Sequence, residues 1–391
     1  MMRQVWLRWL PAGMSILCLF ALAPTMRAEE WVIKAGKVYT LTGAPLAPGA
    51  VHVKDGKIVE VSSEIQVPNG VKVIDLPHGV IIPGLVDANT DANIVTHANE
   101  VTQELTPSYR TSTAIDWQAR GFRQALLEGI TTLGLLPGTD NVIAGQLAVV
   151  KTSGAKAKRT LVEDGGLVIT VASDPANRNS SRQRPDSIYN RQPTNRMGVV
   201  WMLRSTFTAA LQNHPNSSPI VIDALKGKRT IYGVSRIDSD ILSLLRLAKD
   251  FQFQPILVDG NEAYKVKEQL ASAKVPVLLS KVISTSGTTT EGSEVFWNQG
   301  GELHQAGITF AFTGGNLLDQ ARFAIRYGCP KGIALEAITK TPARLLGVGH
   351  RVGTIAVGMD ADLLALTGDP FELTTAVAWV MVQGQLHRQG Q

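Results

Sequence analysis

The chain has 391 residues, of which 44% are hydrophobic and 18% are charged. Its formal net charge is +5 at pH 7, and it contains only two cysteines. This length and composition suit one barrel-sized domain with a large apolar core and a smaller second domain. The charge is modest, and no basic stripe is interleaved with aromatic residues, which excludes nucleic-acid binding as the main function.

Residues 1–28 have the pattern of an export signal. Two arginines precede an apolar segment, Leu10 to Ala23, that is too short to span a bilayer, and a cleavage site ends at Ala28. Removal of this segment takes away three arginines and no acidic residue, which lowers the formal charge to +2. Cys329 then remains alone, so the mature chain has no intrachain disulfide. We expect a periplasmic or extracellular protein that contacts a membrane only if the signal segment remains uncleaved.

Both ends of the remaining chain have the character of short β-strands. Residues 29–82 alternate between apolar and polar positions, and the pair Asp55-Gly56 between two apolar runs is typical of a hairpin. Residues 351–391 show the same alternation, and Asp360 and Asp362 are interpreted there as turn or cap residues. We expect the two ends to pair into one small composite β-sandwich.

Between these ends, residues 83–350 alternate between strand and helix patterns, which indicates a parallel sheet. The predicted strands are Val80–Val86, Thr131–Leu136, Leu147–Val150, Leu167–Val171, Thr230–Val234, Pro255–Val258, Val275–Leu279 and Ile308–Phe312. The predicted helices are Ala119–Glu128, Ile241–Asp250, Glu262–Ala273, Leu318–Tyr327 and Ile333–Thr339. This α/β pattern fits a (β/α)8 TIM-like barrel. Residues 173–197, rich in Asn, Arg, Ser and Pro, are predicted to form a long loop at its mouth.

One stretch carries most of the functional information. The apolar run Gly79–Val86 ends abruptly in a polar one, as a buried strand does when its carboxyl end opens into a pocket. Asn89 and Asp91 are two residues apart, so on an extended backbone their side chains point to the same side. The stretch resembles the first barrel strand of the amidohydrolase superfamily, in which two metal-binding histidines occupy these two positions.

Other motifs resemble the imidazolonepropionase-like subgroup of metallo-dependent hydrolases. They include Asn99-Glu100-x-Thr102, Gly129-Ile130-Thr131-Thr132, Pro137-Gly138-Thr139-Asp140-Asn141, Asn195-Arg196-Met197-Gly198 and Lys340-Thr341-Pro342-Ala343. The resemblance runs from about Val32 to Gly384. It implies the barrel fold and the composite terminal domain, and it implies a metal site at the carboxyl ends of the barrel strands.

The ligand positions that this resemblance implies are substituted throughout. Gly233 and Ser235 occupy the histidine positions after strand five, and Asp259 occupies the histidine position after strand six. Gly314 occupies the position of the strand-eight aspartate, which shuttles a proton for the metal-bound water. The strand-four lysine position holds Val168. The sequence therefore predicts that the imidazole cage is lost and that no cofactor is bound.

Two interpretations of the remaining polar residues stay open. The oxygens of Asn89, Asp91 and Asp259 are hard ligands that suit Ca²⁺ or Mg²⁺. Alternatively, they form a hydrogen-bonded cluster in the space that the metal vacated. Three basic residues are candidates to neutralise the aspartates: Lys151, Arg196 and Arg236. His97 is the one histidine whose predicted position could reach the mouth, and a surface role is its other interpretation.

These observations favour a non-catalytic exported protein on an amidohydrolase scaffold, with a small-molecule ligand in the barrel mouth. The alternative is a hydrolase that acts on non-peptide C–N bonds of cyclic amides, or on peptides, through an altered or hard-metal site. The sequence allows an oligomer and does not name the ligand.

Overall fold

The computed structural model describes residues 29–90, 92, 94–95, 98–100, 102–179, 192–280 and 296–388. The expected export signal, Asp91 and His97 lie outside these described residues. No helix in the described part of the chain is long and apolar enough to cross a membrane.

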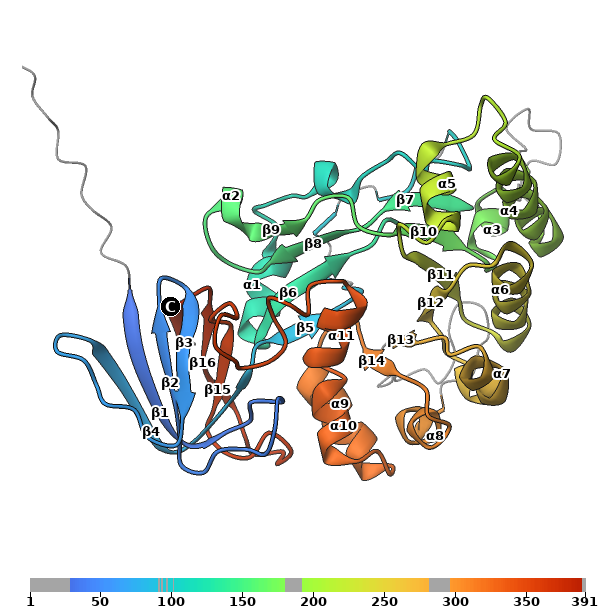
Figure 1. The fold of residues 1–391 in the computed structure, drawn as a ribbon. Helices are drawn as coiled ribbons and strands as arrows, with labels where there is room; N and C mark the ends of the chain where they lie inside the picture. Colours follow the sequence, from blue (N-terminus) through green and yellow to red (C-terminus); the bar gives the residue numbers. More distant parts are fainter. Residues whose placement is uncertain are drawn as a thin grey trace, which may run out of the picture.

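The two ends of the chain form one seven-stranded sheet (Figure 1). The N-terminal strands are β1 (Glu30–Val38), β2 (Gly49–Lys54), β3 (Lys57–Ser62) and β4 (Lys72–Pro83). The C-terminal strands are β15 (Leu363–Leu366), β16 (Val377–Val382) and β17 (Gln385–Arg388). The strand order is β17-β16-β15-β4-β1-β2-β3, with β4 parallel to β1 and antiparallel to β15. The two ends therefore pair in one sheet, while the expected two-layer sandwich stays a prediction.

The hairpin between β2 and β3 forms as predicted. Asp55 and Gly56 have φ angles of 54° and 76°, which suit a tight turn between twisted antiparallel strands. The C-terminal segment folds back over this hairpin, because the Ile58 amide donates to the Met359 carbonyl (3.0 Å) and the Ala361 amide donates to the Gly56 carbonyl (2.9 Å).

The central part of the chain contains two further sheets. One holds β5 (Leu85–Asp87), β6 (Ile130–Leu135), β8 (Ala148–Lys151) and β9 (Thr160–Val162). The other holds β7 (Ile143–Gln146), β10 (Leu167–Thr170), β11 (Ile231–Ser235), β12 (Pro255–Asp259), β13 (Val277–Leu279) and β14 (Phe310–Phe312). Strands β10 to β14 run parallel to one another, as predicted.

The third predicted strand runs in the opposite direction to its neighbours. Residues 143–151 form β7 and β8, separated by Leu147, and β7 is antiparallel to β10 while β8 is antiparallel to β6. The connection from β6, residues 136–142, is too short for a crossover helix, so the chain turns back instead. The expectation of an all-parallel sheet was wrong for this strand.

The first and last central strands are joined indirectly. In the described part of the chain no ladder pairs β5 with β14. Instead, the Phe312 amide donates to the Ala337 carbonyl (3.0 Å) and the Val86 amide donates to the Ile338 carbonyl (3.0 Å). The architecture is therefore TIM-barrel-like and α/β, with mixed sheets rather than one closed ladder.

The predicted strand Val80–Val86 divides into two strands at Gly84. Pro83 ends β4 and pairs with Leu363, and the Gly84 amide donates to the Asp362 carbonyl (2.9 Å). A side chain at residue 84 would clash with Thr131 at 2.4 Å, so only glycine allows this close approach. The single apolar run therefore passes from the terminal sheet into the central one.

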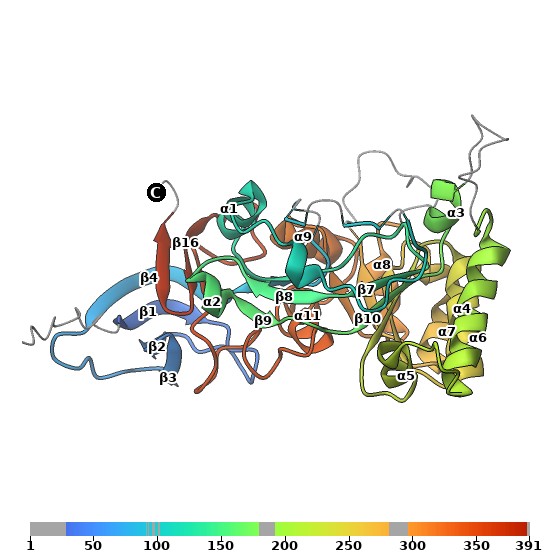
Figure 2. The ribbon, with the colours of Figure 1, turned by 90° about the horizontal axis from the view of Figure 1, so that it is seen from above.

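Helices cover the outside of the central strands (Figures 1 and 2). They are α1 (Arg120–Leu127), α2 (Lys156–Arg159), α3 (Asp174–Asn179), α4 (Arg196–Leu211), α5 (Pro219–Leu225), α6 (Asp238–Phe251), α7 (Lys267–Ser272), α8 (Gln299–Gln305), α9 (Leu317–Arg326), α10 (Lys331–Glu336) and α11 (Lys340–Leu345), with short 3-10 helices η1 (Thr111–Ala114) and η2 (Ala263–Val266). The five predicted helices correspond to α1, α6, η2 with α7, α9 and α10. The predicted loop at 173–197 contains α3 and the start of α4, and its middle lies outside the described residues.

Two apolar layers result. One lies between strands and helices and includes Leu203 of α4 and Leu244 of α6. The other fills the interior that the strands surround and includes Val168, Tyr232 and Val258. Alternate strand residues face these two layers, and the interior layer forms the floor beneath the polar residues at the carboxyl ends.

Candidate functional site

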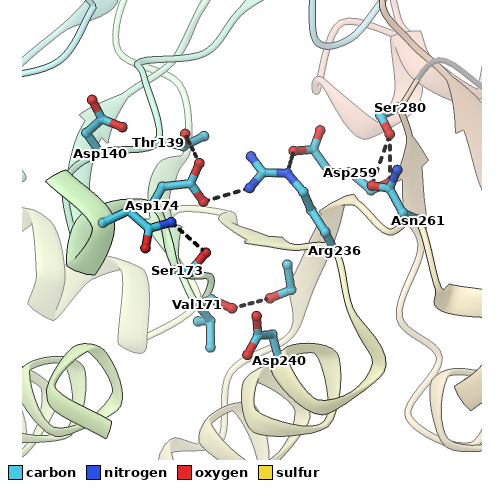
Figure 3. Close-up of polar contacts among 12 residues, drawn as sticks. Thr139, Asp140, Val171, Ser173, Asp174, Arg236, Asp240, Asp259, Asn261 and Ser280 are labelled. Atoms are coloured by element: carbon cyan, nitrogen blue, oxygen red, sulfur yellow. Dashed lines mark hydrogen bonds and ion pairs between the residues drawn. The ribbon is translucent and has the colours of Figure 1, made fainter. Parts of the chain in front are cut away.

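An arginine held between two carboxylates forms the centre of the site (Figure 3). The Arg236 Nε donates to Asp259 Oδ2 (2.9 Å), and Arg236 Nη1 donates to Asp174 Oδ2 (2.6 Å). The side chains of Arg236 and Asp259 are each 13% exposed, and that of Asp174 is 20% exposed. Water therefore screens these ion pairs only in part, and each is stronger than a surface pair.

The strands explain why these three residues meet. Tyr232 and Val234 of β11 face the interior, so the same alternation places Arg236 above them at the carboxyl end of the strand. Asp259 ends the neighbouring strand β12 with φ of 72°, which departs from the extended backbone. Asp174 starts α3, soon after the end of β10 on the other side of β11. The three residues thus come from three adjacent strand ends.

The first central strand contributes an amide and a buried carboxylate. The Asn89 Nδ2 donates to Asp259 Oδ1 (3.4 Å), so both oxygens of Asp259 have partners. Asp87 is fully buried and accepts the backbone amides of Asn89 (3.2 Å), Gly314 (3.1 Å) and Gly315 (2.9 Å). The Asp87 carboxylate therefore ties the end of β5 to the loop after β14.

Further polar contacts surround this centre. The Thr139 hydroxyl donates to Asp174 Oδ1 (3.0 Å), which fixes the second oxygen of that carboxylate. The Ser280 hydroxyl donates to Asn261 Oδ1 (3.2 Å) and to the Asp259 carbonyl (3.3 Å) (Figure 3). A continuous hydrogen-bonded network thus runs along the strand ends from β6 to β13.

The positions predicted after strand five do not face this network. A Cβ atom at Gly233 would lie 2.6 Å from Leu244 of α6, so this residue faces the helix layer. Ser235 lies on the same face of β11, is fully buried, and donates its hydroxyl to the Val171 carbonyl (3.2 Å). The prediction that Gly233 and Ser235 line the pocket was wrong, because both point away from the interior.

Two of the predicted charge partners have other roles. Lys151 is fully buried and pairs with Asp360 (3.1 Å) and Asp362, both from the C-terminal segment. The Arg196 Nε donates to both oxygens of Asp240 on α6 (3.0 and 3.1 Å). Lys151 thus links the central and terminal sheets, and Arg196 links α4 to α6. Arg236, in contrast, pairs with a predicted pocket aspartate, Asp259.

Three residues predicted for the pocket, Asn89, Asp259 and Arg236, do lie together in the structure. Gly314 is nearby, since its backbone amide donates to Asp87. The sequence analysis did not identify Asp174, Asp87 or Thr139 as members of the site. Asp87 carried a usable signal, because an acid that follows directly on a buried apolar strand needs partners. Asp174 carried little, because it falls in a stretch whose composition indicates a loop.

The arrangement is a TIM-barrel-like α/β scaffold with polar residues at the carboxyl ends of its strands, and comparison with known proteins shows which family it resembles. The model of the amidohydrolase family matches residues 202–387. An amidohydrolase of Thermotoga maritima MSB8 superposes with a TM-score of 0.82 and 25% identity, covering 92% of this chain and 100% of that one. Aspergillus niger ochratoxinase shares the fold at a TM-score of 0.56 and 17% identity, covering 92% and 96%.

Two curated proteins are more distant relatives. Amidohydrolase tasK of Hapsidospora irregularis is 22% identical over 86% of this chain and 39% of its own length. The N-acetylglucosamine-6-phosphate deacetylase of Danio rerio is 30% identical over 28% of this chain and 30% of its own length. The chain thus spans well under half of either relative. Taken with the fold, these matches show that the chain is similar to members of the amidohydrolase superfamily over most of its length.

The described residues do not fit the metal that this superfamily implies. No group of three or more His, Cys, Asp or Glu side chains in the described part of the chain is placed to hold an ion. Asp259 is engaged by Arg236 and Asn89, and Asp87 is engaged by backbone amides. The Asp259 carboxylate is already paired with the guanidinium of Arg236. The positive charge of this guanidinium would repel a metal ion that approached the carboxylate.

Proposed function

We propose that this chain is an exported pseudoenzyme of the amidohydrolase superfamily that binds a small-molecule ligand at the mouth of its barrel. The observation that carries the proposal is the pairing of Arg236 with Asp259. The sequence resemblance assigns Asp259 to the position of a metal ligand after strand six. The guanidinium of Arg236 supplies the positive charge beside Asp259 that a metal ion would otherwise supply. The mouth keeps hydrogen-bonding groups for a ligand but lacks an acid at residue 314 to shuttle a proton.

The finer organisation belongs to the same proposal. Residues 83–350 form the superfamily's (β/α)8 barrel, with a reversed third strand, and residues 29–82 and 351–391 form its composite β-sandwich. Residues 1–28 direct export and are removed. The indirect link between β5 and β14 through residues 337–338 supports a barrel-like enclosure of the interior.

Metal content is the first test of this proposal. We expect protein purified without chelator to contain far less than stoichiometric zinc, nickel, iron or manganese, measured by plasma mass spectrometry. We also expect no saturable heat of binding when Ca²⁺ or Mg²⁺ is titrated into it. A stoichiometric metal that is lost on Asp259→Asn would instead support the hydrolase alternative, with Asn89, Asp91 and Asp259 as ligands.

Activity on C–N bonds is the second test. We expect no hydrolysis of cyclic amides, N-acylated amines or dipeptides above the rate of a matched Asp259→Asn variant. Asp250→Asn is the control, because Asp250 pairs with Arg204 on the surface of α6 and lies outside the network. Turnover that Asp259→Asn abolishes and Asp250→Asn preserves would overturn the proposal.

A further inference from the structure

A cavity of about 460 Å³ lies beside the mouth, outside the Arg236 network. Its walls come from Val95 and residues 98–100, which include the acidic Glu100, from residues around η1, and from Pro137 and Ala144 near β6 and β7. Its volume falls within the range of small-molecule sites, roughly 300–1,000 Å³. One wall is apolar and includes Val95, Pro137 and Ala144. The lining also includes Arg110 and several residues with hydroxyl groups, among them Ser108, Thr111 and Thr113.

One buried hydroxyl at this cavity has no hydrogen-bond partner among the residues that the structure describes. Thr111 lines the cavity and is 5% exposed, and its Oγ1 makes no hydrogen bond to any described residue. Buried hydroxyl groups in folded proteins are nearly always hydrogen-bonded, because leaving one unpaired costs about 1–3 kcal/mol. An acceptor that reached this hydroxyl from the cavity would remove that cost, so Thr111 is the hydroxyl we consider for a ligand contact.

The neighbouring residue supplies a positive charge. Arg110 lines the cavity, is exposed, and forms no ion pair with any described residue. Its backbone is held in place, since the Arg110 carbonyl accepts the Thr113 amide (3.1 Å) and the Thr113 hydroxyl (2.8 Å). The preceding carbonyl, of Tyr109, accepts the Gln146 amide (2.8 Å) at the end of β7. The segment is thus pinned to a strand before any ligand arrives, which lowers the entropic cost of binding.

The cavity is close to the network but chemically separate from it. The Asn99 Oδ1 accepts the Asp140 amide (3.0 Å), and the Ala98 carbonyl accepts the Gly138 amide (3.0 Å). Thr139, which lies between Gly138 and Asp140 in the sequence, donates a hydrogen bond to Asp174 on the other side of the loop. One loop therefore separates Arg110 and the Thr111 hydroxyl from the Arg236 network, in which the charged groups are already paired.

We propose that this cavity binds a small carboxylate with an apolar body. Arg110 pairs with the carboxylate, the Thr111 hydroxyl donates a hydrogen bond to it, and the apolar wall contacts the body of the ligand. A guanidinium beside a hydroxyl donor suits the planar, doubly accepting carboxylate group. The inference does not depend on whether the barrel mouth is catalytic.

The test compares N-acetyl-L-phenylalanine with N-acetyl-L-phenylalanine amide, which differ only in the charged group. Calorimetric titration of the mature protein should show the acid binding about tenfold more tightly than the amide. Arg110→Met should weaken binding of the acid about tenfold and leave the amide unchanged. Arg123→Met is the control, since Arg123 is exposed on α1 outside the cavity, and it should bind both compounds like the wild type.

A second variant separates binding from stability. Thr111→Val removes the unpaired hydroxyl with little change of shape, so it should weaken binding of the acid about threefold without lowering the melting temperature. Asp259→Asn should leave both affinities unchanged, which distinguishes this cavity from the barrel mouth. Equal affinity for acid and amide, no binding of either up to about 10 mM, or no effect of Arg110→Met would each overturn the proposal.

Discussion

At the scale of single residues, Lys151 shows how a buried charge joins two parts of the fold. It is one of the largest fully buried side chains in the described part of the chain, and its ammonium group contacts the carboxylates of Asp360 and Asp362. Both aspartate side chains are 2% exposed. The cluster follows from a lysine in an apolar strand, which is stable inside a protein only with its charge compensated.

Replacing Lys151 with Met should lower the free energy of unfolding by about 3–5 kcal/mol, because two buried carboxylates lose their shared partner. Urea denaturation measures this loss. Lys57→Met is the matched control, since Lys57 also pairs with Asp360 but is 47% exposed, and it should cost about 0–1 kcal/mol. Similar losses for the two variants would contradict the assignment of the buried cluster as a structural link.

Arg236 offers a second residue-level prediction. Arg236→Lys should destabilise the protein by about 1–2 kcal/mol, because one ammonium group cannot reproduce the two directed contacts of the guanidinium. Arg236→Met should cost about 2–4 kcal/mol, since Asp174 and Asp259 then repel each other without a cation. Thermal unfolding at low and high salt checks both values. Equal stability of Met and Arg at residue 236 would show that the pairing is not stabilising.

At the scale of elements, α1 is held against the loop after β5 by a glycine. A Cβ atom at Gly121 would lie 1.9 Å from the Ala92 carbonyl oxygen, so the helix approaches the loop more closely than a side chain permits. This loop follows Asn89, and its position therefore bears on the site. The low helix propensity of glycine, about 0.5–1 kcal/mol relative to alanine, is the cost of that contact.

Gly121→Ala should therefore destabilise the protein by about 1–3 kcal/mol, although alanine favours helices. Gly332→Ala in α10 is the control, because no atom lies within 4 Å of the added Cβ. That exposed substitution should stabilise the protein by up to about 1 kcal/mol. The close packing is confirmed if chemical denaturation shows a lower free energy of unfolding for Gly121→Ala and a higher one for Gly332→Ala. A higher free energy of unfolding in both variants would refute it.

At the scale of the whole molecule, the two chain ends and the central strands form one connected body. Strand β4 pairs with both N-terminal and C-terminal strands and leads directly into β5. Asp360 accepts charge-assisted contacts from Lys57 of β3 (2.6 Å), Lys151 of β8 (3.1 Å) and Arg351 (3.0 Å). We therefore expect the terminal and central sheets to unfold together rather than as separate units.

The acid limit of stability should reflect Asp360. Burial raises the pKa of this carboxyl group, but Lys151, Lys57 and Arg351 outweigh burial and hold its pKa below the ordinary value. A depressed pKa contributes stability above the unfolded value, about 3.9, and that stability is lost as pH falls through the folded pKa. We expect the urea midpoint to decline below about pH 4. Asp360→Asn should be less stable at pH 7 and should lack this part of the decline.

The sequence predicted the elements that depend on local pattern. Strands β10 to β14 are continuous apolar runs between polar turns, and helices α1, α6 and α9 have one apolar face, so each could be located from its own residues. The Asp55-Gly56 hairpin was predicted for the same reason. Helix α4 was not predicted, because it is apolar around much of its surface and no single face marks it.

The sequence predictions were wrong where contacts between residues far apart in the chain determine the strand direction or the partner of a side chain. Nothing local to residues 143–151 indicates that this strand runs antiparallel, and only the short connection before it carries a signal. Lys151 and its aspartates are separated by more than two hundred residues, so their pairing required the joined ends of the chain. Gly233 was placed by resemblance to a motif, whereas the alternation of β11 directs it toward α6.

The ion pairs of Arg236 with Asp174 and Asp259 also have an evolutionary consequence. Under the proposed function, a metal site at this position would require the removal of a guanidinium, the release of two carboxylates and the addition of several histidines, and none of these substitutions would be useful alone. The first step, loss of Arg236, leaves Asp174 and Asp259 uncompensated and lowers stability before any metal affinity appears. A histidine introduced at Asn89 would meet a carboxylate that is already paired. Under the proposed function, each single substitution toward a metal site would therefore lower stability first, which favours refinement of the existing polar site over a return to metal binding.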